Sequence, residues 1–282
     1  MIGRHWKLPD VPLRTSVIRT HAFGLLAVLL VAVAARAGLD LSALYPLKAA
    51  GVFVAVTVLA IGFVGAHHPF QRYGPGNLTT TLRAALVGLV AGLAGEPGIP
   101  IVAASAAGAG LAATALDGVD GWLARRTRMT SAFGARFDME TDVLLVLALS
   151  VLAWQYGKAG AWVLLCGLMR YGFVVAGWLW PWLRGPLAPS VRGKAICVVQ
   201  FVGLSLTIVP AIRPPFSSLV AAVTLAALAY SFLVDVLRLK RSAAKGFSQW
   251  HGEGALGPAS SLERIAKSDA VQAFRPARRG GP

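Results

Sequence analysis

Apolar residues occur along this chain in long blocks separated by short polar breaks. A membrane-spanning helix needs about 20 predominantly apolar residues, and eight blocks approach or exceed that length. They cover residues 20–38, 47–66, 78–95, 98–117, 138–156, 159–183, 194–211 and 215–237. Turn residues and charges fill the breaks, as at Tyr45-Pro46 and Glu96-Pro97-Gly98. The pattern predicts an all-α integral membrane protein with about eight transmembrane helices.

The composition agrees with this class. The chain is 56% hydrophobic and 14% charged, whereas about a quarter of the residues of a soluble domain are charged. The two cysteines, Cys166 and Cys197, both lie within apolar blocks. We therefore expect reduced, buried thiols and no disulfide.

The distribution of basic residues indicates the orientation. A net charge of +15 also occurs in nucleic-acid-binding proteins, but no recognisable nucleic-acid module accompanies it. With the N-terminus in the cytoplasm, 21 of the 27 Lys and Arg residues fall inside and four outside. The positive-inside rule then predicts an inner (cytoplasmic) membrane protein with both termini cytoplasmic. We therefore expect the excess positive charge to attract anionic lipid headgroups, and we expect no nucleic-acid partner.

A cluster of acidic residues joins the fourth and fifth predicted helices. Asp117 and Asp120 are spaced i, i+3 at one helix end, and Asp138 and Asp142 are spaced i, i+4 at the start of the next. Each pair therefore shares a helix face, and a short loop between antiparallel helices would bring the two faces together. Four carboxylates repel unless cations lie between them. Oxygen ligands of this kind suit two divalent cations, Mg²⁺ or Mn²⁺.

The spacing within this region also matches a known signature. The stretch from Asp117 to Asp142 fits D-x2-D-G-x2-A-R-x8-G-x3-D-x3-D at every fixed position, and in this it resembles the CDP-alcohol phosphatidyltransferases (class I). Two weaker segments agree, namely Asn77-x2-Thr80-x2-Arg83 upstream and Ser190-x2-Gly193-Lys194 downstream. The sequence differs from the family's pattern at Ile196 and Cys197, where the family often has Lys and Thr.

The resemblance implies a reaction and a set of roles. A phosphatidyl-type group would pass from a CDP-lipid such as CDP-diacylglycerol to an alcohol, with release of CMP, in phospholipid biosynthesis. The four signature aspartates would bind the two metal ions, and Asp142 would also be the catalytic base. The residues expected to bind the CDP-lipid are Asn77, Thr80, Arg83, Gly121, Ala124, Arg125, Ser131 and Gly134.

The acceptor is expected to meet basic residues. Arg136, Arg170, Arg192 and Lys194 would form a cationic pocket, which favours a phosphorylated acceptor such as glycerol 3-phosphate. Inositol phosphate, inositol, serine and choline are the alternatives. Structural pairing of Arg136, an internal salt bridge of Arg170, and membrane anchoring by Arg192 and Lys194 are the structural alternatives to acceptor binding. We interpret Glu140 as structural.

The resemblance also organises the chain. Residues 1–76 would form an N-terminal segment with two extra helices, 77–242 the six-helix catalytic domain, and 243–282 a basic, disordered cytoplasmic tail. Homodimers are common in the family, so a homodimer is expected. His67 and His68 beside Pro69 are interpreted as an interfacial pair. A membrane transporter and an inactive scaffold are the rival functions; the clustering of the acids at one edge disfavours the first.

Overall fold

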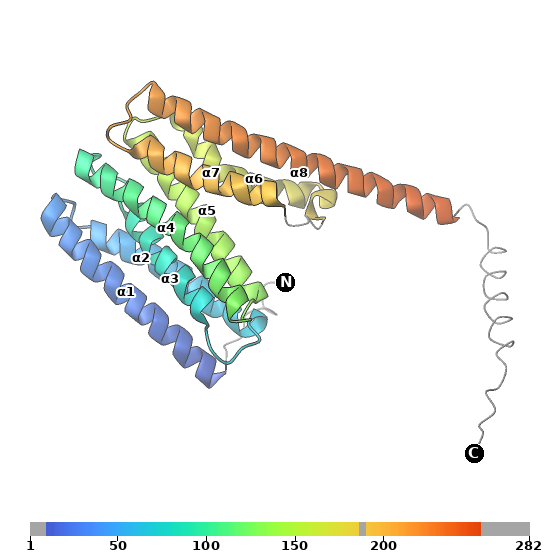
Figure 1. Cartoon of the computed structure of the whole chain (residues 1–282), viewed down its shortest axis with the longest axis horizontal. Coiled ribbons are helices and arrows are strands. Elements are labelled where there is room, and N and C mark those ends of the chain that lie inside the picture. The colour runs from blue at the N-terminus through green and yellow to red at the C-terminus, as the bar shows by residue number, and fades with distance from the viewer. Residues whose placement is uncertain (1–9, 186–189, 255–282) are drawn as a thin grey trace, which may run out of the picture. The chain divides into compact units, whose positions relative to one another are not determined.

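The computed structural model describes residues 10–185 and 190–254, in which all regular secondary structure is helical (Figure 1). The α-helices are α1 (Val11–Leu39), α2 (Tyr45–His67), α3 (Pro75–Gly92), α4 (Pro100–Arg126), α5 (Ala132–Gln155), α6 (Leu165–Leu179), α7 (Val191–Ile208) and α8 (Phe216–Gly254). Two 3-10 turns, η2 (Ala161–Leu164) and η3 (Pro181–Arg184), flank α6.

The eight predicted spans correspond one by one to these eight α-helices, which confirms the predicted fold class. Among the described residues, six helices are long and apolar enough to cross a membrane: α1, α2, α4, α6 with its preceding turn, α7 and α8. The other two, α3 and α5, combine apolar residues with polar and charged ones. These two helices carry Arg83, Asp138 and Asp142, and these charged residues account for their weaker apolar character.

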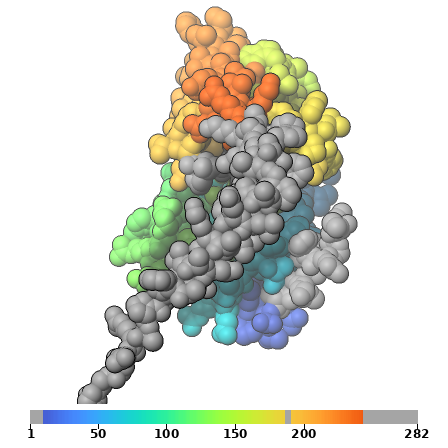
Figure 2. Space-filling model, turned by 90° about the vertical axis from the view of Figure 1, so that its right-hand side faces the viewer, coloured from blue at the N-terminus to red at the C-terminus, as the bar shows by residue number. Residues whose placement is uncertain are grey.

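The chain divides into two compact units, residues 1–176 with 189–232 and residues 177–188 with 233–282. In the first unit α3 is central and packs against α1, α2, α4 and α5, while α7 packs against α4 and α5. The N-terminal helices therefore cover α3. The space-filling view shows blue atoms from the start of the described chain next to cyan atoms of the α3 region (Figure 2).

Glycines let α2 approach α3 closely. A Cβ atom at Gly92 would lie 2.9 Å from the backbone nitrogen of Ala49, and one at Gly88 would lie 3.0 Å from the carbonyl oxygen of Ala49. Small residues of this kind permit tight helix contacts in membranes, where packing rather than solvent exclusion holds helices together. The sequence on α3 thus fixes a close α2–α3 pair.

A buried carboxylate closes the end of the first unit that lies away from the acidic cluster. Glu96, in the α3–α4 loop, is 2% exposed. Its carboxylate accepts hydrogen bonds from Lys48 Nζ, from the Ser42 backbone N–H (2.8 Å) and from Ser42 Oγ (2.6 Å). Gln155 Nε2 of α5 donates to the Glu96 carbonyl oxygen (2.6 Å). Glu96 therefore joins the α1–α2 turn, the α3–α4 loop and the end of α5.

Glu96→Gln is expected to lower the thermal unfolding midpoint at neutral pH. Burial alone would raise the pKa of Glu96, but hydrogen bonds from Lys48 and Ser42 outweigh burial and hold this pKa below its ordinary value. The ionised carboxylate therefore stabilises the fold above its unfolded pKa, and this contribution is lost as the pH falls through the lowered folded pKa. Charge-assisted hydrogen bonds of this kind contribute about 1.5–3 kcal/mol. A melting series from pH 7 to acid should show the variant and wild type converge; a constant difference would contradict the assignment.

The second unit contains the end of α6, η3 and the C-terminal part of α8. Arg184 Nε donates to the Gly177 carbonyl oxygen (2.7 Å), and Trp178 and Trp180 are exposed. Helix α8 continues to Gly254, twelve residues beyond the boundary at which the tail was predicted to start. The rest of the predicted tail, 255–282, lies outside the described residues.

Candidate active site

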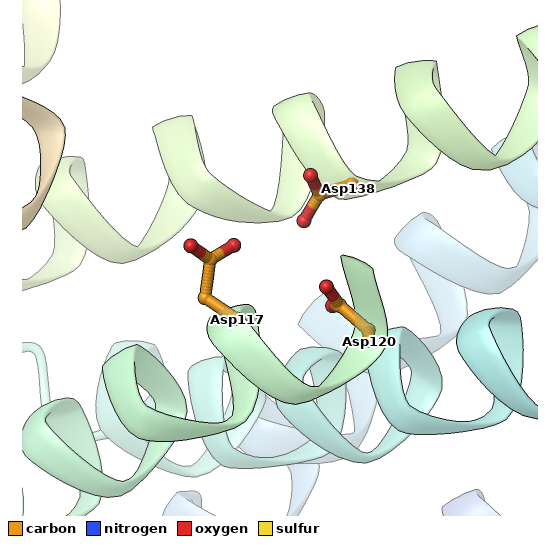
Figure 3. A group of neighbouring side chains, drawn as sticks. All are labelled: Asp117, Asp120 and Asp138. Atoms are coloured by element: carbon orange, nitrogen blue, oxygen red, sulfur yellow. The ribbon is translucent and has the colours of Figure 1, made fainter. Parts of the chain in front are cut away.

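Three aspartates from two helices point toward one another. Asp117 and Asp120 lie near the C-terminal end of α4, and Asp138 lies in the second turn of α5 (Figure 3). Their nearest carboxylate oxygens all lie within 4.8 Å of one another. The residues between the helices, Thr127 to Ser131, form the short loop that the sequence predicted, and this loop turns α5 back along α4.

The side chain of Arg83, from α3, lies among the acids. Its Nη2 is 2.9 Å from Asp117 and also contacts Asp142, while its Nη1 is 2.6 Å from Asp120 and also contacts Asp138. Arg83 is 1% exposed. One guanidinium thus faces four carboxylates, so three negative charges remain without compensation from this group.

The donor set fits divalent cations. All the converging ligand atoms are carboxylate oxygens, which hard cations prefer, and the unbalanced negative charge favours added positive charge. Thr80 Oγ1 donates to Asp120 Oδ2 (3.2 Å) and fixes that carboxylate. All four predicted metal ligands are brought together, three of them as a compact group. The fourth, Asp142, joins that group through Arg83.

A cavity of about 200 Å³ opens beside the aspartates. Asp120 and Asp138 contribute to its wall, so the cavity and the acidic cluster share a boundary. Seven of the eight residues predicted to bind the CDP-lipid line it: Asn77, Thr80, Gly121, Ala124, Arg125, Ser131 and Gly134. The eighth, Arg83, contacts the carboxylates instead, because α3 places its side chain one turn further along the helix than Thr80.

Small residues create the cavity. A Cβ atom at Gly76 would lie 3.0 Å from Ala124 Cβ, so glycine lets α3 and α4 meet at this end. A Cβ atom at Gly134 would lie 2.8 Å from Asn77 Oδ1. At Gly121 the nearest atom to an added Cβ is Arg125 Nη1, at 3.1 Å. Larger residues at these positions would fill the space or push apart its walls.

The basic residues predicted for the acceptor are only partly brought together. Arg136 Nε lies 3.5 Å and Arg170 Nη2 lies 3.8 Å from Glu140 Oε1, so one carboxylate of α5 joins both arginines. Arg192 and Lys194 lie in the first turn of α7. Helix α7 packs against α4 and α5, the two helices that carry the aspartates.

Two residues that contact the lining of the cavity were not predicted from the sequence. His68, interpreted as an interfacial residue, is 6% exposed and bonds to Ser131. Tyr73 accepts a hydrogen bond at its carbonyl from Asn77 Nδ2 (2.5 Å). Burial raises the pKa of the Tyr73 hydroxyl, even though a hydrogen bond with Thr81 opposes that shift. Both residues precede α3, and no local spacing links them to the loop before α5.

Comparison with known proteins gives one match. The model of the family described as CDP-alcohol phosphatidyltransferase matches residues 75–234, somewhat more than half of the chain. The matched range begins at the first residue of α3 and ends within α8, so it contains the aspartates, Arg83 and the cavity. No curated protein and no solved structure matches the chain.

Proposed function

Since the chain belongs to the CDP-alcohol phosphatidyltransferase family, we propose that it transfers a phosphatidyl group from CDP-diacylglycerol to a small alcohol in the membrane and releases CMP. The observation that supports this proposal best is that the cavity and the acidic cluster share two residues. Asp120 and Asp138 belong to the four converging carboxylates and also line the cavity, whose other walls carry small and hydroxyl-bearing residues. A nucleoside diphosphate bound there would have its phosphates beside the carboxylates.

The carboxylates would hold the divalent cations that the family uses. Asp117, Asp120, Asp138 and Asp142 form the ligand set, and Mg²⁺ or Mn²⁺ bound there would neutralise the diphosphate and make the acceptor hydroxyl more acidic. Arg83 then has a different role from the one that the resemblance implied, because its guanidinium holds the four carboxylates in place. We propose Arg83 as a positioning residue of the site rather than as a nucleotide contact.

The lining of the cavity supports a proposal for where each substrate binds. Asp120 and Asp138 line the cavity, whereas Asp117 and Asp142 do not. We therefore place the nucleotide toward Asp120 and the acceptor toward Asp142. Asp142 would take the proton of the acceptor hydroxyl, and the oxygen would attack the lipid-linked phosphorus. The bond from that phosphorus to the bridging oxygen breaks, and CMP leaves with the electron pair.

The acceptor is proposed to be a phosphorylated polyol, most simply glycerol 3-phosphate. Two arginines share the single carboxylate of Glu140, which leaves one positive charge on that side of α5. Arg192 and Lys194 would add to it from α7. Arginine binds phosphate with paired hydrogen bonds, so a phosphate on the acceptor suits this environment.

The orientation and assembly are also proposals. The asymmetry of Lys and Arg supports an active site that faces the cytoplasm and an inner (cytoplasmic) membrane location. The homodimer expected from the family stays a prediction.

CMP release by purified protein tests the proposed function. CDP-diacylglycerol and Mn²⁺ or Mg²⁺ would be supplied with glycerol 3-phosphate, inositol phosphate, inositol, serine or choline in turn. We expect metal-dependent CMP release with glycerol 3-phosphate. Release only with a non-phosphorylated acceptor would overturn the acceptor assignment. No release with any acceptor, from folded protein, would favour the scaffold or transporter alternatives.

Gly121→Val is expected to weaken binding of the CDP-lipid, because valine would project into the cavity and displace Arg125. We expect the KM for CDP-diacylglycerol to rise by at least about tenfold, the effect of losing roughly 1.4 kcal/mol of binding. Gly118→Val is the matched control, since it lies on the same helix and nothing lies within 4 Å of an added Cβ atom. Equal KM values for the two variants would contradict the placement of the nucleotide.

A further inference from the structure

The histidine that follows α2 contacts the cavity wall from outside the family-matched range. His68 is the residue after the last residue of α2, and the match begins at residue 75. Its ring is buried among aromatic side chains, with centroids 5.3 Å from Phe70, 5.8 Å from Phe133 and 6.5 Å from Tyr73. The ring is therefore held in one orientation.

Hydrogen bonds define which nitrogen of His68 carries the proton. Nε2 lies 2.9 Å from the carbonyl oxygen of Arg72. A carbonyl oxygen only accepts, so Nε2 must be the donor. In the neutral ring, Nδ1 is then the bare nitrogen and accepts. Nδ1 lies 3.0 Å from Ser131 Oγ, so the serine hydroxyl donates its proton to His68.

Ser131 also accepts a hydrogen bond at the same oxygen. It is the N-cap residue of α5, and its Oγ accepts from the backbone N–H of Gly134 (3.0 Å). A hydroxyl has one proton and two lone pairs. The proton points to His68 and one lone pair points to Gly134, so only a lone pair remains. Ser131 is half-buried and lines the cavity, so this lone pair is available to a ligand.

We infer that His68 is a positioning residue that makes Ser131 a hydrogen-bond acceptor toward the cavity, and that this wall selects a base carrying an amino group. The inference rests on the proposed function. Cytosine presents an amine donor at N4, whereas uracil presents a carbonyl acceptor at the corresponding atom. The acceptor on Ser131 complements the first and opposes the second. The N-terminal segment thereby contributes to nucleotide selection through the residue that follows α2.

Binding of CMP and UMP to the purified full-length protein tests the inference without turnover. We expect wild type to prefer CMP by about tenfold or more, the effect of one hydrogen bond. In His68→Leu the serine hydroxyl is free to rotate and donate, so the preference should fall several-fold. His68→Asn keeps an acceptor oxygen close to the position of Nδ1 and should retain the preference.

Two further variants separate orientation from folding. Ser131→Ala should lose the preference, and His68→Leu combined with Ser131→Ala should lose no more than Ser131→Ala alone, since both act on one interaction. His67→Leu is the matched control, because a ring nitrogen of His67 faces the carbonyl of Phe63 within its own helix. If His68→Leu does not accumulate, the preference for CMP over UMP can still be compared between His68→Asn, which should retain it, and Ser131→Ala, which should lose it.

The outcomes distinguish this inference from the proposed function. Suppose that wild type releases CMP, but His68→Leu or Ser131→Ala keeps the same preference for CMP over UMP in binding. That result would overturn the inference about His68 and leave the proposed function intact. Loss of the preference in His68→Asn would also overturn the inference. A folded wild type that neither binds nor releases CMP would overturn the proposed function, and the inference with it.

Discussion

Asp138→Asn is expected to reduce CMP release by at least about a thousandfold, a loss of roughly 4 kcal/mol of transition-state stabilisation. Asp138 is shared by the three-carboxylate group and the cavity wall. Asparagine has nearly the same shape but offers one neutral oxygen, so the change removes charge from the ligand set without removing volume. The protein should still fold and insert, because Asp138 lies in the second turn of α5 with its side chain 36% exposed.

The rate of metal-dependent CMP release from CDP-diacylglycerol measures this effect. Asp40→Asn is the matched control, since Asp40 is an exposed residue of the α1–α2 turn with a φ of 53°. Asparagine tolerates this left-handed conformation as well as aspartate does, so the control should keep full activity. Activity of Asp138→Asn within tenfold of wild type would exclude the proposed metal ligand set.

Arg83→Met is expected to destabilise the protein strongly when divalent cations are absent. The guanidinium contacts four carboxylates and is the nearest positive charge to all of them in the described structure. Removing one partner of a buried ion cluster costs about 3–5 kcal/mol, and the Asp120 side chain, which is 7% exposed, would stay buried without compensation. For a chain of this size the unfolding midpoint should fall by about 10 °C.

Melting curves with a chelator and with Mn²⁺ test this expectation. Mn²⁺ should raise the midpoint of Arg83→Met more than that of wild type, since the four carboxylates of the variant lack the guanidinium that compensates part of their charge and bound metal stabilises the folded state. Arg36→Met is the control, because Arg36 is exposed in the last turn of α1. An Arg83→Met variant as stable as wild type in chelator would show that the cluster does not depend on Arg83.

The aspartates lie together as their spacing in the sequence predicts. Their spacing within each helix fixed which side chains share a face, because a helix has a constant rotation per residue. The short loop between α4 and α5 then brought the two faces together. The convergence of the four aspartates and the helical fold could therefore be predicted from local pattern, whereas the cavity residues on those helices were expected from the family resemblance.

Contacts between distant segments could not be predicted in this way. Arg83 was expected to bind the nucleotide, yet it lies among carboxylates that are 34 to 59 residues away in sequence. His68 was expected at the interface, yet it bonds to Ser131, 63 residues away. The rotation of each helix about its axis decides such contacts, and that rotation depends on packing.

The sequence by itself determined that the protein is a bundle of membrane helices and that four aspartates meet at one end. Apolar blocks in a membrane must form helices to satisfy their backbone hydrogen bonds, and spacing along a helix is fixed. Only the tertiary structure decided that α3 lies at the centre, that Arg83 faces the four acids and that the residue after α2 supports the cavity. Those contacts follow from close packing through Gly76, Gly88 and Gly92, which sets how α3 is turned toward its neighbours.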